Sequence, residues 1–299
     1  AQAVSSPVPT SSSFPFIAML GRLAALGWAA VFAHAAVHVP TREIATGVQM
    51  PIISIGIGGL ETANASAIVS NWLKLGGRGI DTALVYKDQY IVPQELQKAG
   101  IDRKDVFITT KIPGCDSATT NIEYDLKQLK TDYIDLLLIH YPSGDCAKAW
   151  EVLEGYHSKG VLKAIGVSNF NKSALESLMK TAKVKPAVNQ IELNVLEYDA
   201  EALAYSESLN ITVEAYSPVG RSGHSGDISG NKVIQGVAAN HNISTYQVAL
   251  KWIVQHERLL TFQSSSAAHQ AADAEIFDFQ LTEPEMKALD GLHGAPIYV

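Results

Sequence analysis

The stretch Gly79–Tyr86 reads GIDTALVY, so a short apolar run ends in an aspartate and a tyrosine follows five residues later. Two more apolar runs end in a titratable residue: residues 106–111 read VFITTK, and residues 133–140 read YIDLLLIH. Runs of this length and β-branched content, separated by helix-like segments, are typical of buried parallel strands. In a closed parallel barrel, the residues just past the C-terminal strand ends converge on one mouth. The side chains expected to meet there are Asp81, Tyr86, Lys111 and His140.

These four residue types have a shared chemical use. A tyrosine acts as a general acid near neutral pH only if its pKa falls well below the ordinary value of about 10. A nearby ammonium favours the phenolate and lowers that pKa, and a carboxylate behind the ammonium keeps it charged and in place. A histidine can hydrogen-bond the oxygen of a bound carbonyl and orient it. A structural ion pair or a core histidine explains any one of these residues, but not all four in order on separate strands.

The four residues resemble the Asp-Tyr-Lys-His tetrad of the aldo-keto reductases, and the resemblance runs from about Thr41 to Leu292. It implies an α/β fold, the (β/α)8 TIM barrel. It also implies reduction of an aldehyde or ketone to an alcohol with NADPH or NADH as the hydride donor. In this scheme Tyr86 gives a proton to the carbonyl oxygen, Lys111 and Asp81 tune Tyr86, and His140 orients the carbonyl. No metal site is expected.

Three further stretches resemble motifs of this family: residues 166–170 (GVSNF), 189–192 (NQIE) and 215–218 (AYSP). An Asn or Gln amide offers both a donor and an acceptor, which matches a carboxamide. An aromatic ring can stack on the flat nicotinamide. The resemblance therefore assigns this end of the cofactor to Ser168, Asn169, Gln190, Tyr216 and Ser217.

The stretch after the last expected strand, residues 262–273 (FQSSSAAHQAAD), departs from the family pattern. NADPH-using relatives usually carry a lysine where this chain has Gln263, and an arginine where it has His269. A 2′-phosphate carries close to two negative charges and calls for a cationic clamp. Losing both cations should weaken NADPH binding by a few kcal/mol, at about 1.5–3 kcal/mol for each charge-assisted bond. The cofactor is therefore left open between NADPH, NADH and none. The candidates at the adenosine end are Ser264, His269 and Asp273.

Residues 41–50 (TREIATGVQM) are predicted to form a small hairpin with a turn at Thr46-Gly47. Eight βα units follow, from a first strand at residues 52–58 to a last strand at Leu259–Phe262. A long Gly-rich loop is expected at residues 217–231. Tyr141, Trp150 and this loop are candidates for lining the mouth. Cys115 and Cys146 show no metal-ligand or disulfide spacing, so a structural or incidental role is expected for them.

Residues 1–40 are expected to form a unit separate from the barrel at 41–299. Phe14–Val37 contains one formal charge, Arg22, in 24 residues, which suits a membrane-spanning helix. One alternative is an uncleaved signal or bipartite targeting segment with a cleavage-like motif at residues 33–35. Another is an extra helix docked on the barrel. An anchor or targeting segment indicates a membrane-associated, organellar protein, with a plastid as one interpretation, and a docked helix indicates a soluble cytoplasmic one.

The formal net charge of −7 argues against nucleic acid as a main partner. The expected partner is a small-molecule carbonyl substrate. The apolar segment and the altered phosphate clamp support a second hypothesis, in which the chain is a non-catalytic or weakly active subunit of a membrane protein complex.

Overall fold

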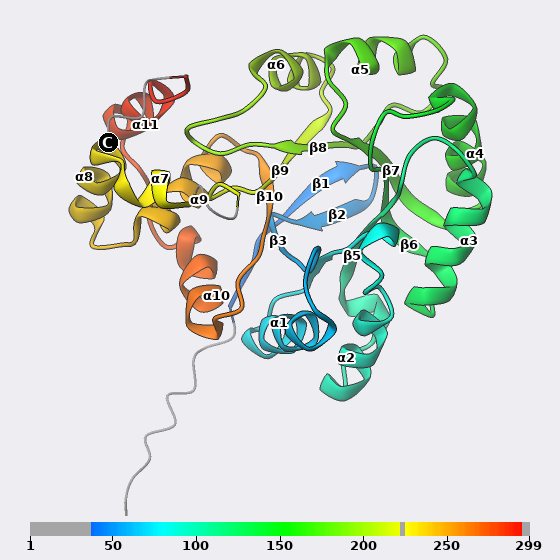
Figure 1. Ribbon diagram of the computed structural model, residues 1–299, viewed down its shortest axis with the longest axis horizontal. Helices are drawn as coiled ribbons and strands as arrows, with labels where there is room; N and C mark the ends of the chain where they lie inside the picture. Colours follow the sequence, from blue (N-terminus) through cyan, green and yellow to red (C-terminus); the bar gives the residue numbers. More distant parts are fainter. Residues whose placement is uncertain (1–36, 222–224, 295–299) are drawn as a thin grey trace, which may run out of the picture. The chain divides into compact units, whose positions relative to one another are not determined.

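The computed structural model describes residues 37–221 and 225–294. Eight parallel strands close a barrel in the order β10-β3-β4-β5-β6-β7-β8-β9. Figure 1 shows these strands surrounded by helices, so the predicted α/β barrel is confirmed. The strands are β3 (Ile53–Gly56), β4 (Gly79–Asp81), β5 (Phe107–Ile112), β6 (Ile134–Ile139), β7 (Leu162–Ser168), β8 (Val188–Glu192), β9 (Thr212–Tyr216) and β10 (Leu259–Phe262).

Each barrel strand is followed by at least one helix. Several helices begin at residues whose side chains cap them, and the capping boxes of Ser244 with Gln247 and of Thr282 with Glu285 fix the starts of α9 and α11. The helices that follow the first four strands of the barrel are α1 (Thr62–Leu75), α2 (Ile91–Ala99), α3 (Ala118–Leu129) and α4 (Cys146–Ser158). The later ones are α5 (Lys172–Met179), α6 (Ala200–Ser208), α7 (Ser225–Gly230), α8 (Lys232–His241), α9 (Thr245–Gln255), α10 (Ala267–Ala274) and α11 (Glu283–Asp290). Short 3-10 turns are η1 (Leu84–Tyr86), η2 (Arg103–Asp105) and η3 (Glu275–Phe277).

A hairpin of β1 (Thr41–Ala45) and β2 (Val48–Pro51) precedes the barrel, as predicted. Gly47 takes a positive φ of 74° at its turn, a conformation that glycine adopts without strain. Ile44 and Met50 pack in one apolar cluster with residues near the N-terminal ends of the strands, among them Leu136 and Leu259. The hairpin therefore covers that end of the barrel and leaves the C-terminal strand ends for a site.

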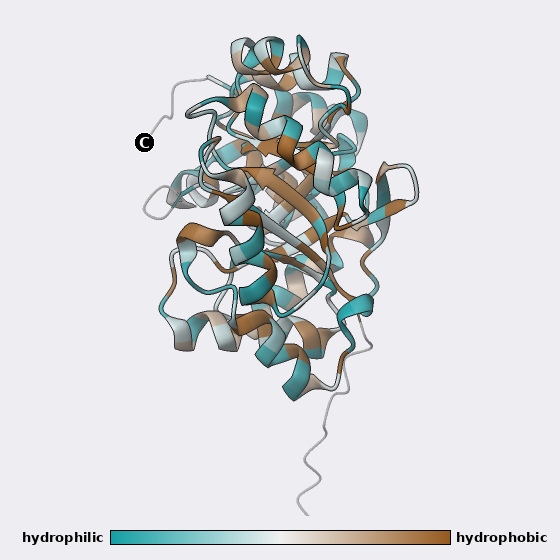
Figure 2. Ribbon diagram, turned by 90° about the vertical axis from the view of Figure 1, so that its right-hand side faces the viewer, coloured by the Kyte–Doolittle hydropathy of each residue, from teal (hydrophilic) through white to brown (hydrophobic). Residues whose placement is uncertain are grey.

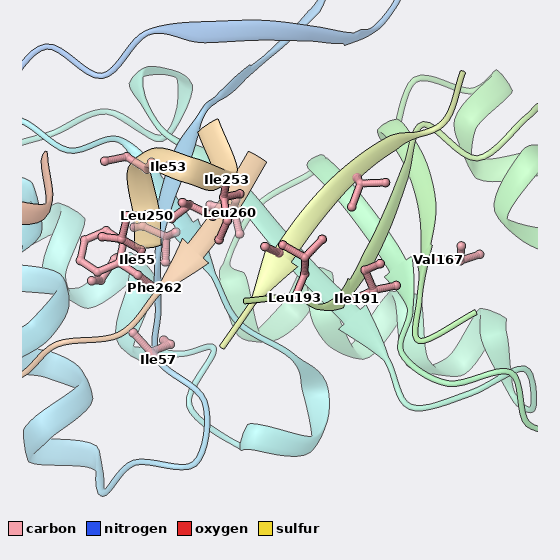
Figure 3. Packing of buried hydrophobic residues seen from close by; sticks show 14 of the residues in the cluster. Ile53, Ile55, Ile57, Val167, Ile191, Leu193, Leu250, Ile253, Leu260 and Phe262 are labelled. Atoms are coloured by element: carbon pink, nitrogen blue, oxygen red, sulfur yellow. The ribbon is translucent and has the colours of Figure 1, made fainter. Parts of the chain in front are cut away.

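The main apolar core lies between the barrel and its helices. Figure 3 shows Ile53 and Ile55 of β3 beside Phe262 of β10 and Leu250 of α9. In Figure 2 the strands are largely apolar, whereas the helices carry hydrophilic residues on their outer turns. Residues that alternate with this outward-facing set point into the barrel, and Ser54 lies between Ile53 and Ile55 in the sequence.

Cys115 and Cys146 form a disulfide bond, a structural role that their spacing in the sequence does not indicate. They lie 31 residues apart in sequence. However, β5 and β6 pair side by side, so the loops that follow these strands are neighbours. The backbone N–H of Cys115 also donates to the carbonyl oxygen of Ser143 at 2.7 Å. Sequence spacing could not reveal this proximity, because it follows from strand pairing.

Within residues 37–221 and 225–294, no helix has the length and apolar character needed to cross a membrane. The segment Phe14–Val37 lies outside the described residues except for Val37. The anchor, targeting and docked-helix hypotheses for it, and the division of the chain at residue 40, therefore stay predictions. The expected loop at 217–231 contains a helix, α7, whose Ser- and Gly-rich sequence has no helical periodicity to reveal it.

Candidate active site

A cleft of about 850 Å³ lies at the C-terminal ends of the barrel strands, where barrel enzymes carry their sites. Its lining includes Asp81, Tyr86 and His140 from the first half of the barrel. The second half contributes the predicted cofactor residues Asn169, Gln190, Tyr216 and Ser217. Strand pairing thus brings into one cleft residues that are more than a hundred positions apart in the sequence.

An ion pair lies beneath the cleft. Lys111 is 1% exposed, and its Nζ donates to Asp81 Oδ1 at 2.6 Å and to the backbone oxygen of Thr82 at 3.0 Å. The same Nζ lies 5.4 Å from the centre of the Tyr86 ring. The rings of Tyr86 and His140 are nearly perpendicular, with 5.7 Å between their centres. The four predicted tetrad residues therefore form one cluster.

The pKa shifts of the ion pair and the tyrosine follow from burial and from this ion pair. Burial has the largest single effect and lowers the pKa of Lys111, but Asp81, Tyr86 and Glu214 together outweigh it and the net pKa is raised, so Lys111 is charged. Burial raises the pKa of Tyr86, and the opposing effect of Lys111 is smaller. The expected lowering of the Tyr86 pKa is therefore present as the contribution of Lys111, but it is wrong for the net value. Tyr86 holds its proton at neutral pH.

His140 is neutral at the pH at which most enzymes work. Burial first, and then the positive charge of Lys111, lower its pKa to about 4. Its Nδ1 is buried and has no hydrogen-bond partner among the described residues. A buried N–H without an acceptor is costly, so the tautomer with the proton on Nε2 is favoured. The ring of Tyr141 stacks on the imidazole at 4.6 Å between centres, which fixes the plane of the donor.

The turn that carries Tyr86 is closed by a hydrogen bond between the residues on either side of it. It is the 3-10 turn η1, and the Oγ1 of Thr82, before the turn, donates to Oδ1 of Asp88, after it, at 2.6 Å. Burial raises the pKa of Asp88 to about 6. A Cβ at Gly58 would come within 2.6 Å of the Tyr86 ring. The glycine in the stretch Gly58-Gly59 is thus explained by the close approach of the tyrosine.

Two of the residues predicted to hold a carboxamide are bonded to neighbours instead. The Oγ of Ser168 donates to the backbone oxygen of Gln190 at 2.9 Å. The Nδ2 of Asn169 donates to the backbone oxygen of His140 at 3.0 Å and to Ser168 Oγ at 3.1 Å. Tyr216 donates from its hydroxyl to Asn169 Oδ1 at 2.8 Å. Of these residues, Gln190 is the one whose side-chain amide oxygen, Oε1, has no hydrogen bond in the described chain.

A fifth polar residue of the cluster, Glu214, was missed by the sequence reasoning. It lies on β9 inside the barrel, and Gln190 Nε2 donates to its Oε2 at 2.8 Å. The available signal was an acidic residue in the middle of an otherwise apolar strand, residues 212–216 (TVEAY). A buried carboxyl group in such a place needs a polar partner.

At the other end, Gln263 lines the cleft and its Nε2 donates to the backbone oxygen of Gly58 at 2.9 Å. Ser264, His269 and Asp273 lie on and just before α10 and do not line the cleft. His269 is exposed. Asp273 is half-buried, and burial raises its pKa to about 7. The structure therefore does not bring these three adenosine-end candidates together with the tetrad.

The two aromatic candidates for the mouth differ. Tyr141 is 51% exposed and lines the cleft beside Val85, which is 46% exposed. Trp150 is 1% exposed, and its Nε1 donates to the backbone oxygen of Val184 at 2.9 Å. Trp150 is thus a core residue, and of these two candidates Tyr141 is the one that lines the cleft.

The residues present fit a nicotinamide nucleotide at the tetrad end of the cleft. The half-buried ring of Tyr216 offers a flat face, and Gln190 Oε1 is an acceptor suited to a carboxamide. The residue Thr261 lines the same cleft, and its buried Oγ1 has no partner among the described residues.

Comparison with known proteins agrees with this geometry. The family model described as "Aldo/keto reductase family" matches residues 53–293. The glyoxal reductase of Bacillus subtilis is 36% identical over 260 residues, which cover 85% of this chain and 92% of that protein. The morphine 6-dehydrogenase of Pseudomonas putida is 33% identical over 269 residues, covering 85% and 91%.

Solved structures agree as well. An aldo-keto reductase from a Medee basin deep-sea metagenome library superposes with a TM-score of 0.80 at 32% identity, covering 87% of this chain and 97% of that one. The Bombyx mori aldo-keto reductase in complex with NADP also gives a TM-score of 0.80, at 28% identity, covering 88% and 96%.

The chain belongs to the aldo/keto reductase family. It is an oxidoreductase of the class that reduces a carbonyl group with a nicotinamide dinucleotide, as the sequence predicted, and the family supports NADP(H) binding. These comparisons do not favour the alternative of a non-catalytic membrane subunit.

Proposed function

We propose that the chain reduces an aldehyde or ketone to an alcohol with Tyr86 as the proton donor. The observation that carries this proposal is the buried Lys111–Asp81 ion pair beneath the Tyr86 ring, beside a neutral His140. His140 donates from Nε2 to the carbonyl oxygen and places it within reach of the Tyr86 hydroxyl. A bound NAD(P)H supplies the hydride to the carbonyl carbon.

The raised pKa of Tyr86 is compatible with this role. At neutral pH the phenol keeps its proton until the substrate oxygen gains negative charge and takes it. The phenolate that remains is stabilised by the Lys111 ammonium. Asp81 holds that ammonium in position through the 2.6 Å bond. The carbon thus gains a hydride and the oxygen a proton, which gives the alcohol.

The rim of the cleft supports a substrate whose carbonyl carries an apolar or aromatic group. Val85 and Tyr141 are large exposed apolar residues beside the tetrad, and such side chains bind apolar parts of small ligands. The relatives named above act, by their names, on glyoxal and on morphine. We therefore infer that small dicarbonyls and aromatic aldehydes are the first substrates to test.

We further infer that the preference for NADPH over NADH is weak. Gln263 and His269 stand where a lysine and an arginine would neutralise a 2′-phosphate, and Gln263 is bonded to Gly58. Ser264, Ser266 and the N-terminus of α10 can still donate hydrogen bonds to a phosphate or a ribose hydroxyl. Asp273 lies further along the same helix.

The test is a titration of NADPH and NADH into the purified full chain, followed by tryptophan fluorescence, and then an assay of aldehyde reduction. Binding of either nucleotide in the micromolar range and consumption of reduced nucleotide with an aldehyde are the expected results. A folded protein that binds neither nucleotide contradicts the proposal. Membrane association through Phe14–Val37 is a separate prediction, to be checked by extraction of native membranes with carbonate and with detergent.

A further inference from the structure

Glu214 is a buried carboxyl group that the chemistry above does not use. It is completely buried on β9, directly opposite Gln190 in the register of β8 and β9. A buried acid without a directly bonded cation is costly. Its Oε1 has no partner among the described residues. Its one hydrogen bond in the described chain comes from Gln190, so any role of Glu214 acts first through that residue.

The geometry fixes which way the amide of Gln190 points. Nε2 donates to Asp81 Oδ2 at 2.9 Å and to Glu214 Oε2 at 2.8 Å. An amide nitrogen has two N–H groups, so both are used. Because both partners are carboxyl oxygens inside the barrel, the nitrogen is the inner atom of the amide. Gln190 lines the cleft, so its Oε1 is the atom presented there.

The charge around Glu214 supports the same arrangement. Burial, and then the negative charge of Asp81, raise the pKa of Glu214 to about 8. At neutral pH Glu214 is therefore uncharged, and it accepts from Gln190 without adding a second negative charge beside the Asp81–Lys111 pair. The charged groups that act on it are Asp81 of β4 and Lys111 of β5, and Tyr86 and His140 are neutral there.

We propose that Glu214 is a positioning residue that takes the second N–H of Gln190 and thereby holds the amide oxygen toward the cleft, as a fixed acceptor for the amino group of a carboxamide. The inference deepens the proposed function and rests on it. It matters because Ser168 and Asn169 are bonded to each other and to the backbone. Gln190 is then the residue whose orientation decides how the carboxamide is recognised.

Removing the acceptor has a defined consequence. With leucine at position 214, Asp81 still takes one N–H of Gln190, but the other N–H loses its buried partner. An unsatisfied buried donor is unfavourable, so the amide turns to bring that N–H to the cleft. There it meets the amino group of the carboxamide, a donor facing a donor. Glutamine at position 214 keeps an acceptor oxygen and preserves the arrangement.

The test compares wild type with Glu214→Leu, which fills the volume without an acceptor, and with Glu214→Gln. The matched control is Asp125→Asn, which alters another fully buried carboxyl, bonded to Gln89 at 2.7 Å and outside the cleft. Dissociation constants are measured for the preferred reduced nucleotide and for the matching ADP-ribose, which lacks nicotinamide. Folding is checked by circular dichroism and thermal melting.

We expect Glu214→Leu to weaken binding of the reduced nucleotide by about tenfold, the equivalent of one hydrogen bond. ADP-ribose binding stays unchanged, and Glu214→Gln and Asp125→Asn behave like wild type. Equal nucleotide affinity in wild type and Glu214→Leu overturns the role of Glu214 while leaving the proposed function intact. Equal losses for the nucleotide and for ADP-ribose also overturn it, because the damage is then general. Failure of wild type to bind any nucleotide contradicts the proposed function itself.

A second measurement covers the case in which Glu214→Leu does not fold. In wild type, raising the pH from 7 to 9 ionises Glu214, and the carboxylate is a stronger acceptor for the N–H of Gln190. We therefore expect the dissociation constant of the reduced nucleotide, relative to that of ADP-ribose, to fall several-fold. In Glu214→Gln the ratio stays constant over the same range, because residue 214 no longer titrates. A wild-type ratio that does not fall, or a Gln variant that follows wild type, overturns the proposal.

Discussion

The two ends of the cleft are built differently. At the tetrad end, Lys111, Asp81, Gln190 and Glu214 are buried and joined by successive hydrogen bonds of 2.6–2.9 Å. Toward α10, Gln263 at the end of the cleft and His269 outside it are exposed, and within the described chain Gln263 bonds to backbone oxygens alone. The tetrad end is a connected network of buried hydrogen bonds, whereas the end toward α10 consists of surface side chains that do not bond each other. We therefore expect that chemistry and cofactor choice can each be changed by mutation without the other.

The largest effect is expected from Tyr86→Phe. The change removes the hydroxyl and keeps the ring that lies over Lys111. Since a positioned general acid contributes about 10²–10⁴ to a rate, kcat for aldehyde reduction should fall by about 10³. The dissociation constant of the reduced nucleotide should stay within about twofold, because the hydroxyl group is lost without a charge or a fold change. Steady-state kinetics and fluorescence titration on the same preparation measure both quantities.

The separation of the two ends gives the control. Gln263→Ala alters a residue of the same cleft away from the ion pair and should retain kcat. A Tyr86→Phe variant that keeps most of its kcat would show that the proton comes from another group, and the distinction between a reacting end and a binding end would be lost.

The next largest effect concerns the other end. The double change Gln263→Lys with His269→Arg restores two cations near the expected 2′-phosphate position. At about 1.5–3 kcal/mol for each charge-assisted bond in full, and less for exposed groups, NADPH affinity should rise by about 10- to 100-fold. NADH affinity and kcat should change little. Dissociation constants for both nucleotides at low and high salt measure this, and the gain should shrink at high salt. An equal gain for NADH would contradict the assignment of these positions to the 2′-phosphate.

The same contrast explains what sequence could predict. Asp81, Lys111 and His140 end apolar strands, and the rule that such ends converge in a parallel barrel was enough to bring them together. Register was not predictable in this way, so Glu214 was missed although it lies opposite Gln190. The disulfide was missed for the same reason, because it follows from the pairing of β5 and β6.

A second limit of the sequence is that it does not show which of two opposing effects on a side chain is larger. Sequence gave the sign of the effect of Lys111 on Tyr86, but not that burial exceeds it. It also placed Ser168 and Asn169 near a carboxamide without showing that they bind each other. The burial of a side chain, and the protein groups that it bonds in place of a ligand, depend on the packed structure, so they cannot be predicted until its neighbours are known.

A smaller effect is expected from Asp273 on α10. Its pKa is raised to about 7 by burial, so the group is mostly neutral at pH 6 and mostly charged at pH 8. Its negative charge then opposes a bound dinucleotide, which is also negative. For a partly exposed charge worth about 0.5–1 kcal/mol, affinity should fall two- to fivefold from pH 6 to pH 8. In Asp273→Asn the affinity for ADP-ribose, which lacks the nicotinamide that Glu214 affects, should not change with pH over this range, as measured by titration at constant ionic strength. A wild-type affinity that does not fall, or an equal fall in Asp273→Asn, would place Asp273 away from the dinucleotide.

The smallest effect on binding concerns the disulfide, which lies only at the tetrad end. Cys146 is five residues after Tyr141, whose ring stacks on His140. The double change Cys115→Ser with Cys146→Ser frees this loop, and its stability should fall by about 2–4 kcal/mol, the usual contribution of one disulfide. The bond from Cys115 N–H to Ser143 remains available to serine, so the loop should keep its path and lose only rigidity. We therefore expect KM for the carbonyl substrate to rise by about two- to threefold, or roughly 0.5 kcal/mol. The dissociation constant of the reduced nucleotide should not change, because α10 has no part in this bond.

Treating wild type with a dithiol should reproduce the KM change, and the serine variant should not respond. A change in nucleotide affinity without a change in KM would mean that the two ends are mechanically coupled, contrary to the picture of a separable cleft.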